Sequence, residues 1–234
     1  MDFQDHRQYL PGDDPRYIDW SAYARTGHYS MKLYREESSP SVDLIVDTSA
    51  SMNTGEAKRE RTLDLVFFAV ESALHAGCGT RCFTTDPRRP WPLESILAHQ
   101  PPPDPTADFN LSALPFRGGS LRVLISDLLF PGDPDPHLTA LAANRGRAVI
   151  LSPFAASEKE PDWSGNMDLV DCEHRDVRKQ HVSPALLDRY RAAYQRHFDL
   201  WLDASQRHSV RLARISTDGD LVTALKTQTA LDLL

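Results

Sequence analysis

The sequence predicts an α/β fold in which a doubly wound, mainly parallel sheet is flanked by helices. Short apolar runs recur at Val42–Val46, Leu121–Ser126 and Arg147–Leu151, and each has the length and composition of a buried strand. Stretches with helical spacing of apolar residues alternate with these runs, as expected for a doubly wound sheet. The chain has 234 residues, which suits one large domain with added segments and a substantial core.

The composition excludes several classes of protein. A formal net charge of -7 argues against non-specific nucleic-acid binding, which needs a basic surface. No run of about 18 apolar residues is present, so we expect no membrane span, and the first residues do not resemble a secretory signal. The chain has three cysteines, Cys78, Cys82 and Cys172. A low and odd number of cysteines is typical of a protein in a reducing compartment. We therefore expect a cytoplasmic protein that meets protein partners.

Residues 1–40 differ from the rest of the chain because they mix aromatic with charged side chains. Turn residues at Pro11, Gly12 and Pro15 interrupt this segment, and Tyr29–Glu36 alternates loosely, as a strand does. We expect an N-terminal arm or small β side segment, packed on a main domain that comprises residues 41–234. The alternative is a dedicated binding surface, since arginine and aromatic residues are enriched at protein interfaces.

The stretch Ser41–Met52, SVDLIVDTSASM, joins a buried strand to a polar loop. Asp47, Ser49 and Ser51 follow the strand in D-x-S-x-S order. In open α/β sheets, ligands bind at the carboxyl ends of the strands, and hard oxygen ligands of this kind suit Mg²⁺. The alternative for Asp47 is a cap on the helix that follows, because its carboxylate can accept from free backbone N–H groups.

Three motifs stand out in the first 52 residues: R-x-Y-x-P-G-D-D-x-R-x-I-D-W at Arg7–Trp20, A-R-T-G at Ala24–Gly27 and D-x-S-x-S-M at Asp47–Met52. Together they resemble a bacterial family of unknown function that carries a von Willebrand factor A-like domain and often accompanies MoxR-type AAA+ ATPases. Weaker matches follow at 125–127, 169–171, 189–190 and 214–218, so the resemblance spans nearly the whole chain. It implies a metal ion-dependent adhesion site that holds Mg²⁺, or else Mn²⁺ or Ca²⁺.

The region after this loop predicts a helix, a strand and an irregular connection. Glu56–Ala76 carries apolar residues at helical spacing, and glycines end it. Arg81–Thr85 is a candidate strand. Asp86–Pro105 is rich in proline, so we expect an irregular connection around a short helix at Leu93–His99.

Two further ligands are implied by the resemblance. Von Willebrand A-like domains supply a threonine from a second loop, and Thr106 is the best placed candidate, although the usual preceding glycines are absent. A helix cap is the alternative for Thr106. Asp127, after the strand Leu121–Ser126, corresponds to the aspartate of the third loop. Asp47 and Asp127 can meet only if their two strands are neighbours in the sheet.

The C-terminal half continues the alternation of helices and strands. Ser183–Ser205 is strongly amphipathic, with Ser183 as a suitable cap and Pro184 in the first turn. The remaining expected elements are helices at Pro136–Asn144 and Asp220–Leu231, and strands at Arg147–Leu151, Met167–Val170 and Val210–Ile215.

The motifs favour a binding protein over an enzyme. Signatures of phosphate-binding loops, dinucleotide folds, serine hydrolases and zinc proteases are missing. A Mg²⁺-dependent phosphohydrolase of the haloacid dehalogenase type is the enzyme alternative, but it needs an acid–base aspartate where this chain has Ser49. We expect a non-catalytic interaction domain whose ion binds a partner's Asp or Glu. The resemblance implies a MoxR-type ATPase as partner, in chaperone-like complex assembly or maturation. A metal-free scaffold is the third hypothesis.

Overall fold

A computed structural model describes residues 2–10, 13–35, 40–105 and 109–231. The chain divides into two compact units, Met1–Ser39 and Pro40–Leu234, which we describe separately. The expected packing of residues 1–40 on the main domain stays a prediction. Among the described residues, no helix has both the length and the apolar character needed to cross a bilayer.

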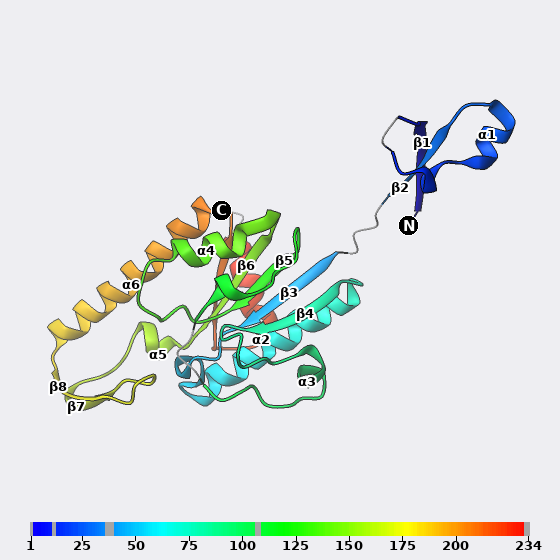
Figure 1. The fold of residues 1–234 in the computed structure, drawn as a ribbon. Helices are drawn as coiled ribbons and strands as arrows, with labels where there is room; N and C mark the ends of the chain where they lie inside the picture. Colours follow the sequence, from blue (N-terminus) through cyan, green and yellow to red (C-terminus); the bar gives the residue numbers. More distant parts are fainter. Residues whose placement is uncertain (1, 11–12, 36–39, 106–108, 232–234) are drawn as a thin grey trace. The chain divides into compact units, whose positions relative to one another are not determined.

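The first unit is a small antiparallel ribbon with one helix. Strands β1 (Asp2–Gln8) and β2 (Ser30–Arg35) pair, and the helix α1 (Trp20–Thr26) lies between them in sequence (Figure 1). Asp19 caps α1 by accepting from the backbone N–H groups of Ser21 and Ala22. Gly27 ends the helix with φ 71°, a left-handed conformation that favours glycine. The strand expected at 29–36 is therefore present, with a partner strand that the polar sequence of β1 did not indicate.

The aromatic side chains of this unit pack against one another. The rings of Tyr23 and Tyr29 stack with centroids 4.5 Å apart, and Trp20 meets both rings edge-on. Arg7 and Asp13 form a bidentate ion pair, in which each of the two hydrogen bonds is 2.7 Å long. Because these contacts lie inside the unit, the mixture of aromatic and charged residues builds a small structure of its own.

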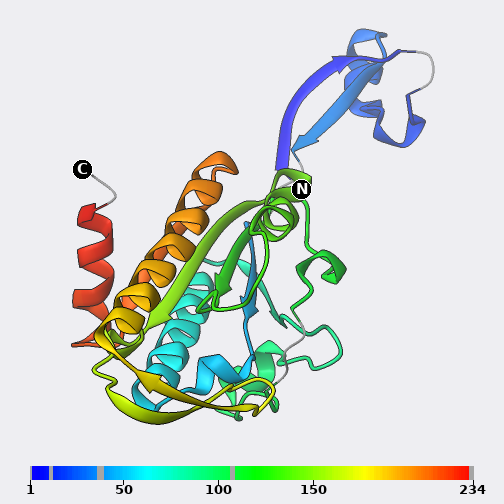
Figure 2. The ribbon, with the colours of Figure 1, turned by 90° about the vertical axis from the view of Figure 1, so that its left-hand side faces the viewer.

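The second unit is built on a five-stranded parallel sheet, which confirms the predicted fold class. The strand order is β4 (Gly79–Thr84), β3 (Ser41–Val46), β5 (Leu121–Ile125), β6 (Arg147–Phe154) and β9 (Arg211–Ser216). All four pairings are parallel. Helices cover both faces of the sheet (Figures 1 and 2).

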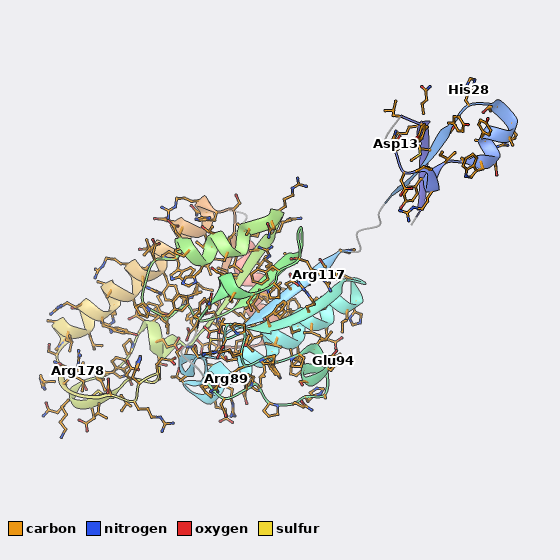
Figure 3. All side chains as sticks on the ribbon, in the orientation of Figure 1. Asp13, His28, Arg89, Glu94, Arg117 and Arg178 are labelled. Atoms are coloured by element: carbon orange, nitrogen blue, oxygen red, sulfur yellow. The ribbon has the colours of Figure 1, made fainter. Side chains whose placement is uncertain are left out.

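Alternate residues along the strands belong to two separate hydrophobic layers, and side chains fill both layers (Figure 3). Leu44 and Val46 belong to the layer beneath α2 (Glu56–His75) and α7 (Leu221–Leu231). Ile45 belongs to the other layer, with α4 (Asp135–Ala142) and α6 (Pro184–Arg207). Two short helices, α3 (Leu93–Leu97) and α5 (Ala156–Lys159), lie in the connections.

A β-hairpin stands apart from the main sheet. Its strands β7 (Gly165–Val170) and β8 (Val177–Val182) pair antiparallel. The strand expected at 167–170 is thus present, but it does not join the parallel sheet. Its partner β8 was not predicted, because VRKQHV is too highly charged to resemble a core strand.

The register of β3 and β5 decides the position of the loops that follow them. Val46 pairs with Ile125, so the two strands end at the same level. The backbone N–H of Asp47 continues the ladder by donating to the carbonyl of Ile125 at 2.9 Å. The strands that precede Asp47 and Asp127 are therefore neighbours, which was the condition for the two carboxylates to meet.

Candidate metal centre

The D-x-S-x-S loop brings its oxygen side chains together at the end of β3. Asp47 is almost fully buried, and its two carboxylate oxygens accept from the N–H of Ser49 at 2.8 Å and from the Ser126 hydroxyl at 2.6 Å. The chain then enters a 3-10 turn, η2 (Ala50–Asn53), which turns Ser51 back toward Ser49. The two serine hydroxyl oxygens lie 2.9 Å apart. The loop thus presents one carboxylate and two hydroxyls in a small space.

Asp127 lies in the adjacent loop, directly after β5, and is also buried. One of its oxygens accepts from the N–H of Leu129 at 3.0 Å. Its own backbone N–H donates to the sulfur of Met52 at 3.1 Å, which ties this loop to η2. Burial, and next the nearby charge of Asp127, raise the pKa of Asp47 to about 6. Two buried carboxylates that disfavour each other's charge make a location suited to a cation.

A buried lysine approaches the same two loops. Lys58, in the first turns of α2, places its ammonium 2.6 Å from Asp127 and 2.6 Å from Glu158. Burial alone would lower the pKa of Lys58, but the charges of Asp127 and then Glu158 raise it above its ordinary value. Lys58 therefore remains an ammonium ion and neutralises part of the negative charge on Asp127.

A carboxylate from the hairpin completes the surroundings. Glu173, in the turn between β7 and β8, accepts from the backbone N–H of Ser51 at 2.9 Å. The contacts around the two loops thus include the carboxylates of Asp47, Asp127, Glu158 and Glu173. They also include the cations Lys58 and Arg214, and Arg214 interacts electrostatically with Asp127 and Glu158.

The donor set fits a small hard cation. The described residues contain no cluster of three or more His, Cys, Asp or Glu side chains that would hold a metal by themselves. A cation here would rely on the Ser49 and Ser51 hydroxyls together with Asp47 and Asp127. Oxygen donors of this kind, with water completing the shell, are what Mg²⁺ accepts. Thr106, the expected second-loop ligand, lies outside the described residues.

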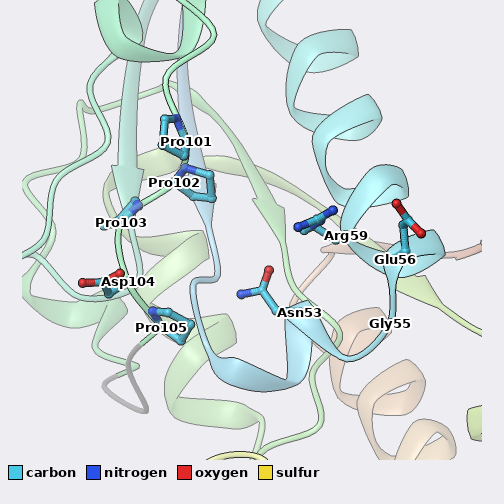
Figure 4. Close-up of a pocket in the computed structure, with 9 residues that line it drawn as sticks. All are labelled: Asn53, Gly55, Glu56, Arg59, Pro101, Pro102, Pro103, Asp104 and Pro105. Carbon is cyan, nitrogen blue, oxygen red and sulfur yellow. The ribbon is translucent and has the colours of Figure 1, made fainter.

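A groove opens beside this loop. It has a volume of about 630 Å³ and is lined by Asn53, Gly55, Glu56, Arg59 and Pro101–Pro105. Figure 4 shows the Asn53 amide and the Arg59 guanidinium facing the prolines, whereas Glu56 lies on the other side of its helix. A smaller cavity shares Asn53, Arg59, Pro102 and Pro103 with the groove and reaches Asp47. The groove therefore adjoins a small cavity that Asp47 lines.

Sequence reasoning missed Lys58, Glu158 and Glu173. For Lys58 a signal was present, because it precedes Thr62 by four residues on the stripe of α2 that also contains the buried Val66. A lysine on a buried stripe needs a carboxylate partner. Glu173 gave no such signal, since 122 residues separate it from Ser51.

Comparisons with known proteins find similarity to proteins of unknown function. Residues 5–79 match the model of a family described as "Protein of unknown function DUF58". The chain is 29% identical over 212 residues to an uncharacterized protein of Mycobacterium bovis, an alignment that covers 82% of this chain and 67% of that protein. An uncharacterized protein of Mycobacterium tuberculosis matches to the same extent.

One solved structure is also similar. The crystal structure of the conserved hypothetical protein BatB from Bacteroides thetaiotaomicron matches with a TM-score of 0.38 and 10% identity, covering 82% of this chain and 97% of that chain. The chain is thus similar to a family of unknown function in its N-terminal part, and to mycobacterial proteins over most of its length.

Proposed function

We propose that this protein is a non-catalytic interaction domain that binds a divalent cation, Mg²⁺ in the first instance, and presents it to a protein partner. The observation that carries the proposal is the convergence of two loops at the ends of β3 and β5. Asp47, Ser49 and Ser51 come from one loop and Asp127 from the other. Thr106 remains the predicted fifth ligand.

The residues of the chain have distinct tasks in this proposal. The Ser126 hydroxyl and the N–H of Ser49 fix both oxygens of Asp47, so the carboxylate is oriented before an ion arrives. The serine hydroxyls are neutral ligands, and Lys58 offsets part of the charge of Asp127. A bound Mg²⁺ with so few charged ligands stays electrophilic and can exchange a water for a carboxylate oxygen. A partner's Asp or Glu would supply that oxygen.

The partner is proposed from the sequence resemblance and from the groove. The resemblance implies a MoxR-type AAA+ ATPase, with this domain acting in chaperone-like assembly or maturation of a complex. The groove beside the loop adjoins a cavity lined by Asp47, which supports it as the place where a segment of the partner docks, and Arg59 faces the groove with a positive charge. An extended, acidic segment is the chemistry that such a groove and ion would accept together.

A metal-free scaffold is the second candidate function, and one contact favours it. The ammonium of Lys58 already pairs with Asp127 at 2.6 Å, so one of the two central carboxylates has a cation without any metal. In this alternative the loops serve only to hold the fold together, and the partner would recognise the groove alone.

Calorimetric titration with Mg²⁺ and Mn²⁺ separates the two functions. We expect saturable binding to the wild-type protein, loss of binding in Asp47→Ala, and wild-type binding in Asp168→Asn, an exposed carboxylate on β7 that serves as matched control. Circular dichroism checks that each variant is folded. Equal behaviour of the wild-type protein and Asp47→Ala would reject the metal centre and leave the scaffold.

A further inference from the structure

Two buried polar side chains next to the groove have no hydrogen-bond partner. Thr48 is 4% exposed and Trp91 is 3% exposed. Within the described part of the chain, neither the Thr48 hydroxyl nor the indole N–H of Trp91 has a partner. Buried polar groups are almost always paired in proteins, because an unpaired one has given up its hydrogen bonds to water. Two unpaired groups at one place therefore indicate a site for a ligand that supplies the partners.

Both residues line the same small cavity. It has a volume of about 30 Å³ and shares Asn53 and Arg59 with the groove beside the D-x-S-x-S loop. A volume of this size holds about two water molecules. The cavity can therefore receive the polar end of a side chain that enters from the groove.

The segments that carry the two groups are held in place. Trp91 lies between Pro90 and Pro92, whose rings restrict the backbone on both sides, and its indole packs in the hydrophobic layer beneath α2. The N–H of Ser49 donates to a carboxylate oxygen of Asp47 at 2.8 Å, which closes a turn around Thr48. A ligand consequently meets groups that are already oriented, and this lowers the entropic cost of binding.

The chemistry of the two groups favours one kind of ligand. An indole N–H only donates, whereas a hydroxyl both donates and accepts. A primary amide satisfies both, with its oxygen accepting from Trp91 and its NH₂ group donating to Thr48. A carboxylate would bring a second negative charge into a cavity that Asp47 already lines, and an apolar group would leave both polar groups unpaired.

The groove outside the cavity suits an extended polypeptide. One of its walls consists of residues 101–105, four of which are prolines, and the Asn53 amide and the Arg59 guanidinium face these prolines (Figure 4). Proline has no N–H, so this wall offers carbonyl oxygens to the N–H groups of a docked backbone. Side chains of an extended segment point alternately to opposite sides, so one of them can enter the cavity while its neighbours stay outside.

We propose that the cavity is a recognition pocket for the side-chain amide of an asparagine or glutamine on an extended segment of the protein partner. This inference rests on the proposed function, because it uses the same docking groove, and it adds the residue type that the partner inserts. The amide oxygen accepts from Nε1 of Trp91, and the amide NH₂ group donates to Oγ1 of Thr48. Segments with aspartate or leucine at this position are rejected, because the site would be left with an unfavourable charge or with unpaired polar groups.

The first test measures stability without any ligand. Thr48→Val and Trp91→Phe each remove one unpaired polar group and keep the shape of the side chain. We expect neither variant to lower the midpoint of urea denaturation, measured in the presence of a chelator, because no hydrogen bond is lost. A lower midpoint in both variants would show that the two groups are paired within the folded protein, through a buried water, and would overturn the inference.

The second test measures recognition with capped heptapeptides that carry glutamates to match Arg59 and differ only at the central residue. That residue is Asn, Gln, Glu or Leu, and a chelator is present throughout. The readout is the indole N–H resonance of Trp91, assigned by its loss in Trp91→Phe and expected to move downfield with the Asn or Gln peptide. We expect the better of these two to bind the wild-type protein about tenfold more tightly than the Glu and Leu peptides.

The variants show whether this preference comes from the pocket. With fluorescently labelled peptides, we expect the preference to fall below about twofold in Thr48→Val and Trp91→Phe. It should be unchanged in Trp163→Phe, a matched control whose tryptophan lines a different cavity. Equal binding of the four peptides to the wild-type protein, an unchanged preference in both pocket variants, or no shift of the Trp91 resonance with any peptide would each overturn the inference.

The outcomes separate this inference from the metal centre, because the peptide measurements contain no free metal. An amide preference in a protein that does not bind Mg²⁺ would leave the pocket standing and reject the metal centre. Mg²⁺ binding that requires Asp47, without an amide preference, would leave the metal centre standing and reject the pocket.

Discussion

Two buried aspartates at opposite ends of β3 have opposite surroundings. Asp43, toward the amino end, accepts from the Arg81 guanidinium at 2.9 Å, from the N–H of Arg117 at 3.0 Å and from the Ser120 hydroxyl at 2.8 Å. Asp47, just past the carboxyl end, accepts from Ser126 and Ser49 but lies near the charge of Asp127. Both side chains are at most 3% exposed.

The difference shows how burial alone fails to indicate function. At the amino end, a cation and two polar hydrogens satisfy one carboxylate, and the arrangement connects β3 to its neighbour β4 and to the loop before β5. At the carboxyl end, burial and the nearby charge of Asp127 raise the pKa of Asp47, so its ionised form is disfavoured in the folded protein. The first arrangement stabilises the fold, whereas the second reduces its stability in the absence of a ligand, which is typical of a binding site.

The largest expected effect is at Lys58. Lys58→Met removes the ammonium that pairs with Asp127 and Glu158, so two carboxylates lose their cation in the interior. We expect the metal-free protein to lose about 3–5 kcal/mol of unfolding free energy. Urea denaturation in the presence of a chelator measures this loss. Added Mg²⁺ should restore a large part of it, and a failure of Mg²⁺ to do so would argue that Lys58 is a purely structural cation.

The second largest expected effect is at Asp43, toward the amino end of β3. Asp43→Ala leaves the Arg81 guanidinium, the N–H of Arg117 (Figure 3) and the Ser120 hydroxyl without their acceptor. We expect a loss of about 3 kcal/mol by urea denaturation, equal with and without Mg²⁺. Dependence of this loss on Mg²⁺ would break the distinction between the two ends.

The third expected effect is the pH dependence that Asp47 gives to the stability of the protein. Its pKa in the folded protein is about 6, above the ordinary value of 3.8 for aspartate, so ionised Asp47 disfavours folding. The wild-type protein therefore gains stability from this group as the pH falls through 6 toward 4, and loses it as the pH rises. Asp47→Asn should stabilise the metal-free protein by about 2–3 kcal/mol at pH 8 and by little at pH 4.

Urea denaturation of the wild-type protein and of Asp47→Asn at pH 8, 5 and 4, in the presence of a chelator, gives the difference in unfolding free energy directly. Saturating Mg²⁺ at pH 8 should reverse the order, because only the wild-type protein gains from the ion. A destabilised Asn variant at pH 8 without metal would contradict the surroundings described for Asp47.

The smallest effect on stability comes from a matched pair of serines. Ser51→Ala should change the unfolding free energy by at most about 0.5 kcal/mol, since among the described residues its hydroxyl has one hydrogen-bond partner, the Ser49 hydroxyl, yet it should weaken Mg²⁺ binding about tenfold. Ser120→Ala should cost about 1 kcal/mol because its donor to Asp43 is lost, and leave Mg²⁺ binding unchanged. Denaturation and calorimetry on the same samples compare the two variants.

The sequence predicted those features that depend on local patterns. The apolar runs located β3, β5 and β6, and the polar residues after β3 located the D-x-S-x-S loop. Asp43 was not predicted to be a buried ion-pair partner because it lies inside an apolar run, and its donors Arg81, Arg117 and Ser120 are distant in sequence. Glu173 was missed for the same physical reason, since its contact with Ser51 joins segments 122 residues apart. The strand β8 was missed because its own sequence, VRKQHV, is too highly charged to resemble a core strand.

The parallel pairing of β3 with β5 has a consequence for the time course of folding. β3 ends at Val46 and β5 begins at Leu121, so a long stretch of chain must be closed before the two loops meet. We therefore expect the candidate centre to form only once β3 and β5 have paired, so that a bound ion does not nucleate this pairing. A bound cation would slow unfolding and leave the rate of refolding nearly unchanged, as for any interaction absent from the transition state.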